Sequence, residues 1–364
     1  MNGIPKKHTL DRRIAIGVFL TTIALCGMSS GSHVYVTDGA AMYFMSCSIL
    51  DHGWFDVELH PNTRGGKYGP DGQYYMPFGF LQPVLGIPFL LAGRRLESVF
   101  EARYLPFFSI TWLNWLACGF LSSIFYLICR QYSLHRRLAL LLAFAVVFST
   151  PLWVYSQTFF AEPLTALLTL LSWHYVTRAH SKSSRSLLAL GGAIAGAVTW
   201  IRPLGGIVIP TLALYCLLLE KSKPGTPGSR RTLLDLCAFS LPAAGGIGIY
   251  LLYNFVRFGS IMETGYDKLP SGMPRSFTLD WQTGLKILLL SPGKSVFVFA
   301  PLMLLVPLGA YIWLKSKTTL PEAVFCLSTG CLYLAVLSRW ARVEGGVAWG
   351  PRLFLPAIPV LFLC

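Results

Sequence analysis

Charged side chains are scarce in this sequence. Of its 364 residues only 13% are Asp, Glu, Lys or Arg, whereas 54% are hydrophobic, and the mean hydropathy is +0.56. A soluble domain carries about 25% charged residues, so this shortage excludes water as the main solvent. The 16 acidic residues stand against 30 Lys and Arg, a formal charge of +14. That excess could indicate nucleic-acid binding, but the positions of the basic residues, given below, indicate a membrane instead.

Several sequence patterns are absent, and each absence removes a class of protein. Runs such as 138–147 and 296–308 are continuously apolar, unlike the alternating strands of a transmembrane barrel, so helices have to satisfy the backbone in lipid. No G-x-x-x-x-G-K-[ST] loop occurs, which argues against an ATP-driven pump. The nine cysteines show no metal-like spacing, and neither do His33, His52 and His60, so no metal site is predicted.

Apolar stretches that can cross a bilayer recur along the whole chain. A helix needs about 20 residues to span about 30 Å of hydrocarbon. The predicted spans are 14–34, 104–129, 138–155, 163–178, 187–201, 204–219, 232–254, 295–314, 320–338 and 352–364. We interpret the first as an uncleaved helix rather than a signal peptide, because later spans anchor the chain. The expected fold class is therefore an all-α, polytopic transmembrane helical bundle of about ten spans.

The basic residues predict the side of the membrane on which each loop lies. With the N-terminus in the cytoplasm, the segments on that side and Arg178 hold 16 of the 30 Lys and Arg, against only Asp11 and Glu220. These segments are 1–13, 130–137, 179–186, 220–231 and 315–319. This positive-inside pattern predicts a multi-pass membrane protein with a cytoplasmic N-terminus. Most acidic residues lie on the outer side, where we expect any polar chemistry.

Two long loops are expected on the outer side, 35–103 and 257–294. The first contains the apolar stretch 78–92, which Pro83 and Pro88 interrupt. Because this stretch is too short and broken for a span, it predicts a helix lying in the membrane interface, where it would shape a cavity.

Two acidic residues at predicted helix ends are candidates for chemistry. Asp38 directly follows the first span, and partial desolvation near the membrane would let its carboxylate act as a general base. Glu162 precedes Pro163 at the start of a span, where an acid so close to hydrocarbon is costly enough to indicate function. The structural alternative is that both residues only stabilise helix N-termini.

Basic residues next to glycine and proline breaks form the complementary set. They are Arg202, Arg257, Lys294 and Arg352. Singly, each could merely bind lipid head groups. Together, at the depth of a lipid phosphate, they predict a phosphate-binding site.

In order and content these segments resemble the GT-C glycosyltransferases that use a polyprenyl-phosphate sugar, such as protein O-mannosyltransferases and lipid A aminoarabinose transferase. The resemblance rests on TDGAAMYFMSCSIL with Asp38, KYGPDGQYYMPFGFLQPVLGIPF with Lys67, and FFAEPLTALL with Glu162. Later stretches that match are NFVRFGSIMETGY, LLLSPGKSVFVFAPL and EGGVAWGPRLFLPAIP. The resemblance covers nearly all of residues 1–364 and implies a single GT-C-like transmembrane domain.

The sequence departs from that family at two points. Many members place a second acid directly after the first, whereas Gly39 stands here, which leaves a requirement for a divalent metal open. Many members also continue into further spans and an outer domain, whereas this sequence ends at Cys364. Either the sequence stops short of the family's C-terminal part or that part is absent.

The resemblance implies an inverting glycosyltransferase that moves a sugar from a polyprenyl-phosphate donor to an acceptor glycan, lipid or protein at the outer face. Asp38 would be the base, Glu162 would orient a substrate, and the four basic residues would bind the donor phosphate. The residues expected to bind the sugar are Lys67, Tyr68, Tyr74, Trp281 and Trp349. Two alternatives stay open at this point: a transporter or flippase of a lipid-linked glycan, and a structural subunit without activity.

Overall fold

The structure is a computed structural model that describes residues 4–31, 37–60, 63, 65–221, 229–266 and 277–364. The α-helices are α1 (Ile4–Ser29), α2 (Thr37–His52), α3 (Leu81–Phe100), α4 (Leu105–Ser109), α5 (Trp112–Gln131), α6 (Arg136–Phe148), α7 (Leu152–Ser156), α8 (Glu162–Lys182), α9 (Arg185–Val198), α10 (Val208–Lys221), α11 (Ser229–Phe258), α12 (Trp281–Leu290), α13 (Val296–Phe299), α14 (Val306–Lys315), α15 (Leu320–Ser338) and α16 (Ile358–Leu361). Three 3₁₀ helices are η2 (Pro203–Ile207), η3 (Pro301–Leu305) and η4 (Arg352–Ala357), and strands β1 (Lys67–Tyr68) and β2 (Tyr74–Tyr75) form an antiparallel hairpin.

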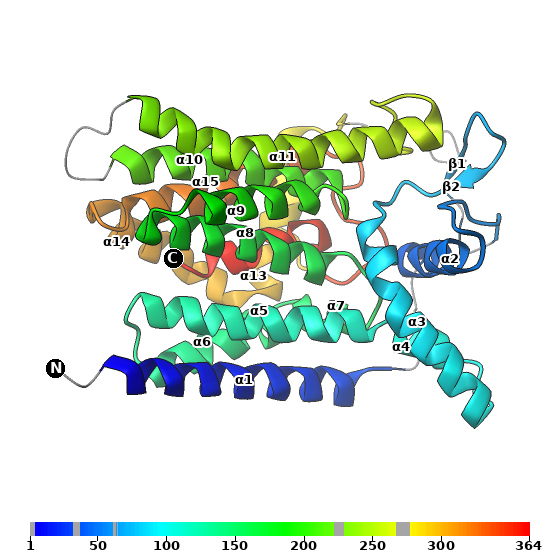
Figure 1. Ribbon diagram of the computed structural model, residues 1–364, viewed down its shortest axis with the longest axis horizontal. Helices are drawn as coiled ribbons and strands as arrows, with labels where there is room; N and C mark the ends of the chain where they lie inside the picture. Colours follow the sequence, from blue (N-terminus) through cyan, green and yellow to red (C-terminus); the bar gives the residue numbers. More distant parts are fainter. Residues whose placement is uncertain (1–3, 32–36, 61–62, 64, 222–228, 267–276) are drawn as a thin grey trace.

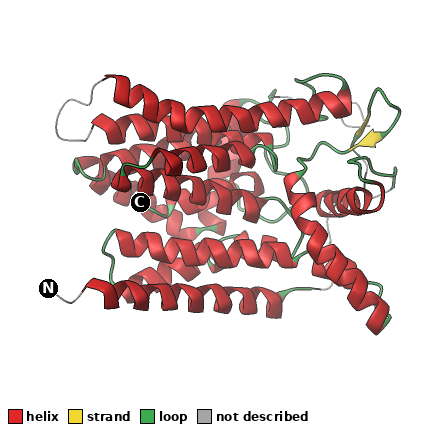
Figure 2. Ribbon diagram, viewed as in Figure 1, coloured by secondary structure: helices red, strands yellow, loops and turns green. Residues whose placement is uncertain are grey.

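The long helices lie side by side and form a bundle (Figure 1). Helices α1, α5, α8, α9 and α11 run roughly parallel, with α9 packed against both α8 and α11, and α1 against α5. Helix α2, the oblique helix α3 and the hairpin gather at one end, which we call the Asp38 end. The opposite end, where α8 turns into α9, is called the His180 end. Figure 2 shows that helices dominate the described chain.

Glycines allow α9 and α11 to pack backbone against backbone. A Cβ atom added to Gly192 would lie 2.0 Å from the carbonyl oxygen of Phe239, and one added to Gly246 would lie 2.6 Å from the Cα atom of Gly196. Larger side chains at these positions would push the helices apart. Small residues at such contacts are the usual way in which helices associate in membranes, where lipid supplies no hydrophobic driving force.

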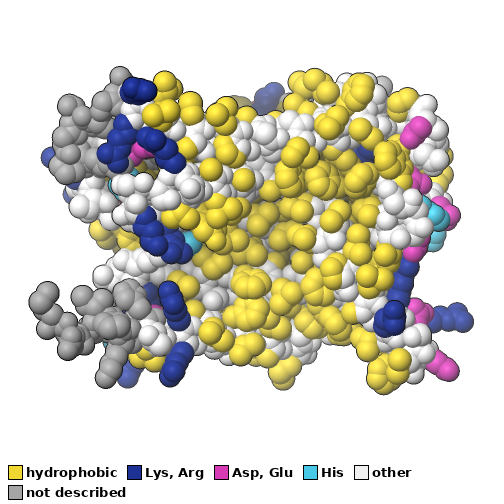
Figure 3. All heavy atoms as spheres, in the orientation of Figure 1, with side chains coloured by type: hydrophobic (Ala, Val, Ile, Leu, Met, Phe, Trp, Pro, Cys, Tyr) yellow, Lys and Arg dark blue, Asp and Glu magenta, His cyan; other side chains and the backbone are white. Residues whose placement is uncertain are grey.

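The surface of the bundle fits a bilayer. On the face shown in Figure 3, hydrophobic side chains cover the middle, Lys and Arg gather at the His180 end, and Asp, Glu and His appear mainly at the Asp38 end, together with further Lys and Arg. Five described helical segments are long and apolar enough to cross a membrane: Thr9–Ser29, Leu105–Gln131, Pro203–Glu220, Arg230–Phe258 and Leu320–Arg339. The expected all-α bundle is therefore confirmed, whereas the count of ten spans stays a prediction.

Proline explains where the helices differ from the predicted spans. The span 138–155 is divided into α6 and α7 at Pro151, and 295–314 is divided into α13, η3 and α14 around Pro301. Proline lacks the backbone N–H that a continuing helix needs and clashes with the preceding turn. At the first of these breaks the Thr150 hydroxyl donates to the carbonyl of Val146 at 2.8 Å and to that of Val147, which Pro151 leaves without its helical donor, at 3.3 Å.

The long loops contain more helix than the sequence indicated. The stretch 78–92, where a helix was expected, contributes to α3, which runs from Leu81 to Phe100, while its place in the membrane interface stays a prediction. In the second loop, α12 was not expected; the Asp280 side chain caps it by accepting a hydrogen bond from the Thr283 N–H at 2.9 Å. Helix α12 packs on α15, where a Cβ on Gly284 would lie 2.0 Å from the carbonyl oxygen of Ser338.

Candidate active site

Three charged residues stand at proline breaks at the Asp38 end. Glu162 is the first residue of α8 and precedes Pro163, while Arg202 precedes Pro203 at the start of η2. Arg352 is the first residue of η4 and follows Pro351. Proline fits the first turn of a helix, and it disfavours helical geometry in the residue before it. Arg202 accordingly has an extended backbone, with φ −155° and ψ 129°.

Asp38 and these three residues form a chain of alternating charge. The Arg352 guanidinium lies 2.9 Å from the Asp38 carboxylate through Nη1 and 3.5 Å from Glu162 Oε1 through Nε. Arg202 Nη1 donates to the same Glu162 oxygen at 2.8 Å. The Glu162 side chain is 1% exposed and that of Asp38 is 24% exposed. Asp38 is therefore the carboxylate that a ligand can reach.

A buried polar cluster fixes the turn before Glu162. The Asn114 amide donates to the carbonyls of Thr158 at 2.6 Å and Phe160 at 2.8 Å, and Gln82 donates to Asn114 and Phe160, each at 3.2 Å. These bonds tie α3 and α5 to the segment that leads into α8. The Phe160 ring also lies 4.8 Å from the Arg352 guanidinium, within the range of a cation–π contact.

A cavity of about 760 Å³ adjoins this chain of charges. We call it the Asp38 cavity. Its lining includes Asp38, Arg202 and Arg352. One wall is apolar and comes from the bundle, and its residues are Leu204, Ile207, Val336, Leu337 and Leu353. The lining also includes Thr37, the first residue of α2, and the loop residues Gly65, Met76, Thr264, Tyr266 and Gly346. A ligand in the cavity would therefore meet charge and hydrocarbon at the same time.

Arg257 does not line this cavity. It is fully buried and its guanidinium donates to the carbonyl of Met76 at 2.6 Å and to Asn254 Oδ1 at 3.0 Å. It also lies 3.7 Å from the centre of the Tyr253 ring. Arg257 thus joins α11 to the first loop, and the cavity's cations come from other positions.

Lys294 binds a loop next to the cavity. Its ammonium donates to the carbonyls of Gly346 at 3.2 Å and of Ala348. The hydroxyl of Tyr155 donates to the carbonyl of Trp349 in the same loop at 2.6 Å. Burial lowers the pKa of Lys294, and the positive charge of Arg352 lowers it further. The two side chains hold the loop that leads into Arg352.

The residues expected to bind the sugar lie outside the cavity lining. Lys67 forms an ion pair with Glu263, and the Tyr74 hydroxyl accepts a hydrogen bond from the Gly66 N–H at 2.8 Å. The side chains of Tyr68, Trp281 and Trp349 are exposed by 59%, 51% and 60%. The structure does not bring these five residues together at the cavity. Their role in sugar binding stays a prediction.

Sequence reasoning missed four side chains that do line the cavity: Arg342, Tyr266, Phe277 and Trp340. Trp340 is at the centre of the aromatic group, with its ring 5.0 Å from Phe277 and 6.2 Å from Tyr266. Trp340 and Arg342 directly follow α15, whose last turn lines the apolar wall. Their position just past the end of a predicted span was the feature of the sequence that could have indicated these two residues.

The donor set does not fit a divalent metal. Asp38 and Glu162 each lie against a guanidinium rather than facing a shared position. Within the described ranges, no group of three or more His, Cys, Asp or Glu side chains is placed to hold a metal ion. The mechanism below therefore uses none.

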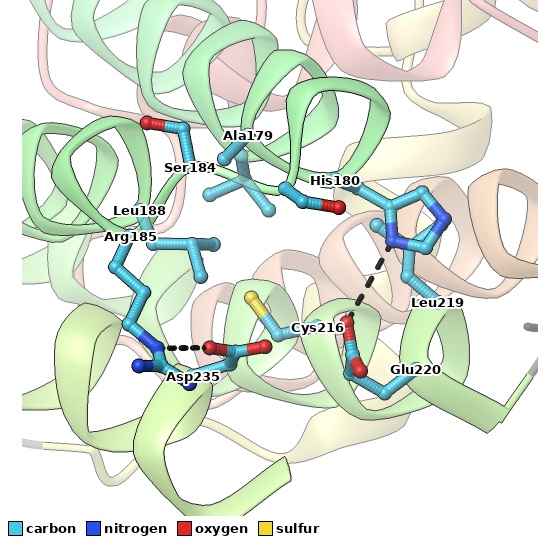
Figure 4. Close-up of a pocket in the computed structure, with 11 residues that line it drawn as sticks. Ala179, His180, Ser184, Arg185, Leu188, Cys216, Leu219, Glu220 and Asp235 are labelled. Carbon is cyan, nitrogen blue, oxygen red and sulfur yellow. Dashed lines mark hydrogen bonds and ion pairs between the residues drawn. The ribbon is translucent and has the colours of Figure 1, made fainter. Parts of the chain in front are cut away.

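A second, much smaller pocket lies at the His180 end, between α8, α9, α10 and α11 (Figure 4). Its volume is about 20 Å³. The Arg185 side chain lies 2.7 Å from Asp235, and His180 Nδ1 lies 3.9 Å from Glu220. The pocket is about the size of one water molecule, so it offers no room for a substrate.

Comparison with solved structures places the chain among integral membrane proteins with a GT-C-like fold. No protein-family model and no curated protein sequence matches it. Among solved structures, the chain is similar to the crystal structure of ArnT from Cupriavidus metallidurans bound to undecaprenyl phosphate, with a TM-score of 0.54 and 12% sequence identity. It covers 99% of this chain and 59% of that protein, so the chain spans about three fifths of the length of ArnT. The expected resemblance to GT-C proteins is confirmed at the level of the fold.

Proposed function

We propose that this chain is a membrane glycosyltransferase that transfers a sugar from a polyprenyl-phosphate donor to an acceptor hydroxyl. The observation that carries the proposal is the Asp38–Arg352–Glu162–Arg202 chain of charges beside a cavity with one apolar wall. A polyprenyl phosphate has the same two characters, an anionic head and a hydrocarbon chain. In support, the structurally similar ArnT was solved with undecaprenyl phosphate bound.

The donor would lie with its head at the arginines and its chain along the bundle. Guanidinium groups form paired, charge-assisted hydrogen bonds with phosphate oxygens, and Arg202 and Arg352 both line the cavity. The prenyl chain would pack on Leu204, Ile207 and the last turn of α15. This orientation presents the sugar to the loop side, next to Asp38.

Asp38 would act as the general base. Its carboxylate takes the proton from the acceptor hydroxyl as the hydroxyl oxygen attacks the anomeric carbon from the face opposite the phosphate. The bond between that carbon and the phosphate oxygen breaks, its electron pair leaves with the lipid phosphate, and the configuration inverts. Charge that grows on the departing phosphate is offset by Arg202 and Arg352.

Glu162 would position the arginines rather than touch the substrate. It is almost fully buried and does not line the cavity, but one of its oxygens is shared by both guanidinium groups. Its other oxygen, Oε2, is buried without a hydrogen-bond partner. Sharing one carboxylate fixes the separation of the two cations.

The Asp38 end would face the outer side of a bacterial inner membrane, with the N-terminus in the cytoplasm. The gathering of Lys and Arg at the His180 end supports this orientation, because cytoplasmic loops carry the excess of basic residues. The acceptor, a glycan, lipid or protein, would then reach the cavity from outside.

The test uses purified protein in nanodiscs with a labelled polyprenyl-phosphate sugar. Asp38→Asn should reduce transfer by about 10²- to 10⁴-fold, because the amide cannot take the proton, while binding of undecaprenyl phosphate is retained. Asp51→Asn is the matched control. Asp51 lies at the other end of α2, where it pairs with Arg94 away from the cavity, so this substitution should change transfer little.

Two outcomes would contradict the proposal. Unchanged transfer by the Asp38 variant would remove this residue as the base. Movement of the intact lipid-linked sugar across the bilayer of a proteoliposome, without any transfer by the wild-type protein, would show a flippase that uses the same cavity.

A further inference from the structure

The lining of the Asp38 cavity is positively charged. Three guanidinium groups border it, those of Arg202, Arg342 and Arg352. Among the lining residues within the described part of the chain, Asp38 is the one carboxylate. A bound molecule therefore meets more positive than negative charge, and the electrostatic complement of this lining is an anion.

Three carboxylates in or next to the cavity lining are already paired with arginine. Asp38 lies 2.9 Å from Arg352, and Glu162 lies 2.8 Å from Arg202. Glu344, beside the cavity rim, lies 3.8 Å from Arg342. A positive group on a ligand would have to share one of these carboxylates with a guanidinium that already neutralises part of its charge.

An aromatic group lines the same cavity. Trp340 is half-buried between Phe277 and Tyr266, with the rings inclined at 63° and 78°. All three line the cavity, as does Arg342 two residues beyond Trp340. Aromatic side chains offer a broad apolar surface with little conformational entropy to lose. The C–H face of an uncharged sugar ring is the part of a donor that such a surface fits.

We propose that the donor sugar packs against the Trp340 aromatic group and is not an amino sugar that carries an ammonium group. The inference rests on the proposed function and narrows its substrate class. A phosphodiester of an uncharged sugar carries one negative charge, which complements the lining. An ammonium group would enter a space bordered by three guanidinium groups and meet like-charge repulsion. A cation–π contact with Trp340 would return less than about tenfold in affinity.

Three donors that share one polyprenyl phosphate and differ only in the sugar test this inference. They carry an uncharged hexose, the corresponding amino sugar and the corresponding uronic acid, and kcat/KM is measured for each with wild-type protein in nanodiscs. The uncharged donor should exceed the amino-sugar donor by roughly tenfold or more, as expected for like charges a few ångströms apart at a partly buried site. Equal or faster transfer of the amino sugar than of the other two would overturn the inference, whereas faster transfer of the uronic acid than of the amino sugar would support it. Transfer from none of the three would contradict the proposed function instead.

A substitution of Arg342 tests the cause of the selectivity. The Arg342 side chain is 45% exposed, so Arg342→Gln should fold. Removing one of three guanidinium groups should narrow the preference for the uncharged donor by roughly threefold to tenfold. Arg95→Gln is the matched control, because Arg95 is an exposed arginine on α3 that does not line the cavity. An unchanged donor preference in the Arg342 variant would remove the charge of the lining as its cause.

Discussion

The two ends of helix α8 carry similar chemistry in different surroundings. At its first residue, Glu162 pairs with Arg202 at 2.8 Å beside a cavity of about 760 Å³. Near its last turn, His180 lies 3.9 Å from Glu220, beside a pocket of about 20 Å³ that the Arg185–Asp235 pair also lines. Both ends therefore combine buried acids with basic partners, but of these two described pockets the one beside Glu162 is large enough for a substrate.

This difference separates charge pairing from function. A buried acid needs a partner wherever the chain places it, because an uncompensated buried charge is costly. Pairing alone is thus expected at both ends. What distinguishes the Asp38 end is that a carboxylate exposed by 24% shares its arginine with a carboxylate exposed by 1%. One acid can meet a ligand while the other keeps the cation in place.

Equivalent substitutions of the acids beside the two ends of α8 test this contrast, and the largest effect is expected from Glu162. Glu162→Gln keeps the shape of the side chain but removes the charge that Arg202 and Arg352 share. We expect kcat/KM for sugar transfer to fall about 10²-fold, as on losing a preorganised electrostatic contact. Glu220→Gln should leave it within about twofold. Both variants are measured in nanodiscs, with thermal unfolding as a check of folding. Equal losses in both would show that the contrast between the ends has no catalytic meaning.

Lys294 tests which contacts at the Asp38 end support the site without binding the substrate. Its ammonium holds the carbonyls of Gly346 and Ala348. Because burial and then Arg352 lower its pKa, Lys294 loses its proton at a lower pH than an ordinary lysine does. The neutral amine binds carbonyls more weakly, so transfer should decline by a few fold as pH rises from about 8 to 10.

A conservative variant isolates this effect. Lys294→Arg keeps its charge over the whole range, because guanidinium does not deprotonate in proteins, and its alkaline decline should begin at higher pH. Lys286→Arg, at an exposed lysine on α12, should keep the wild-type profile. Identical profiles for all three proteins would exclude Lys294 as the titrating group.

The fold was largely predictable from the sequence because bilayer thickness fixes the length of an apolar helix. Each predicted span overlaps described helix, although residues 32–34 of the first lie outside the described residues. Pro151 and Pro301 divide two of the spans without removing them from the bundle. Helix α12 escaped prediction because its ten residues are too few to span. A packing contact with α15 stabilises it, and sequence periodicity does not show such contacts.

The site was only partly predictable for a similar reason. Asp38, Glu162, Arg202 and Arg352 were identified because a charge at a helix break near hydrocarbon is conspicuous. Sequence does not show which carbonyl or carboxylate such a cation meets. Arg257 binds protein carbonyls and lies apart from the cavity, although its pattern resembles that of Arg202. Trp340 was missed because an aromatic residue at the end of a span usually indicates only the membrane interface.

The smallest expected effect concerns the His180 end. Asp235→Asn removes a charge that Arg185 meets at 2.7 Å, but the Arg185 side chain is 53% exposed, so water screens the pair. We expect a loss of about 0.5–1 kcal/mol of stability, seen as a fall of about 1–3 °C in Tm, with transfer unchanged. The double variant Arg185→Gln/Asp235→Asn should lose little more than the single one, since both changes remove the same contact. Reduced transfer at unchanged Tm would instead show that the His180 end takes part in the reaction, and charge pairing would then accompany function at both ends of α8.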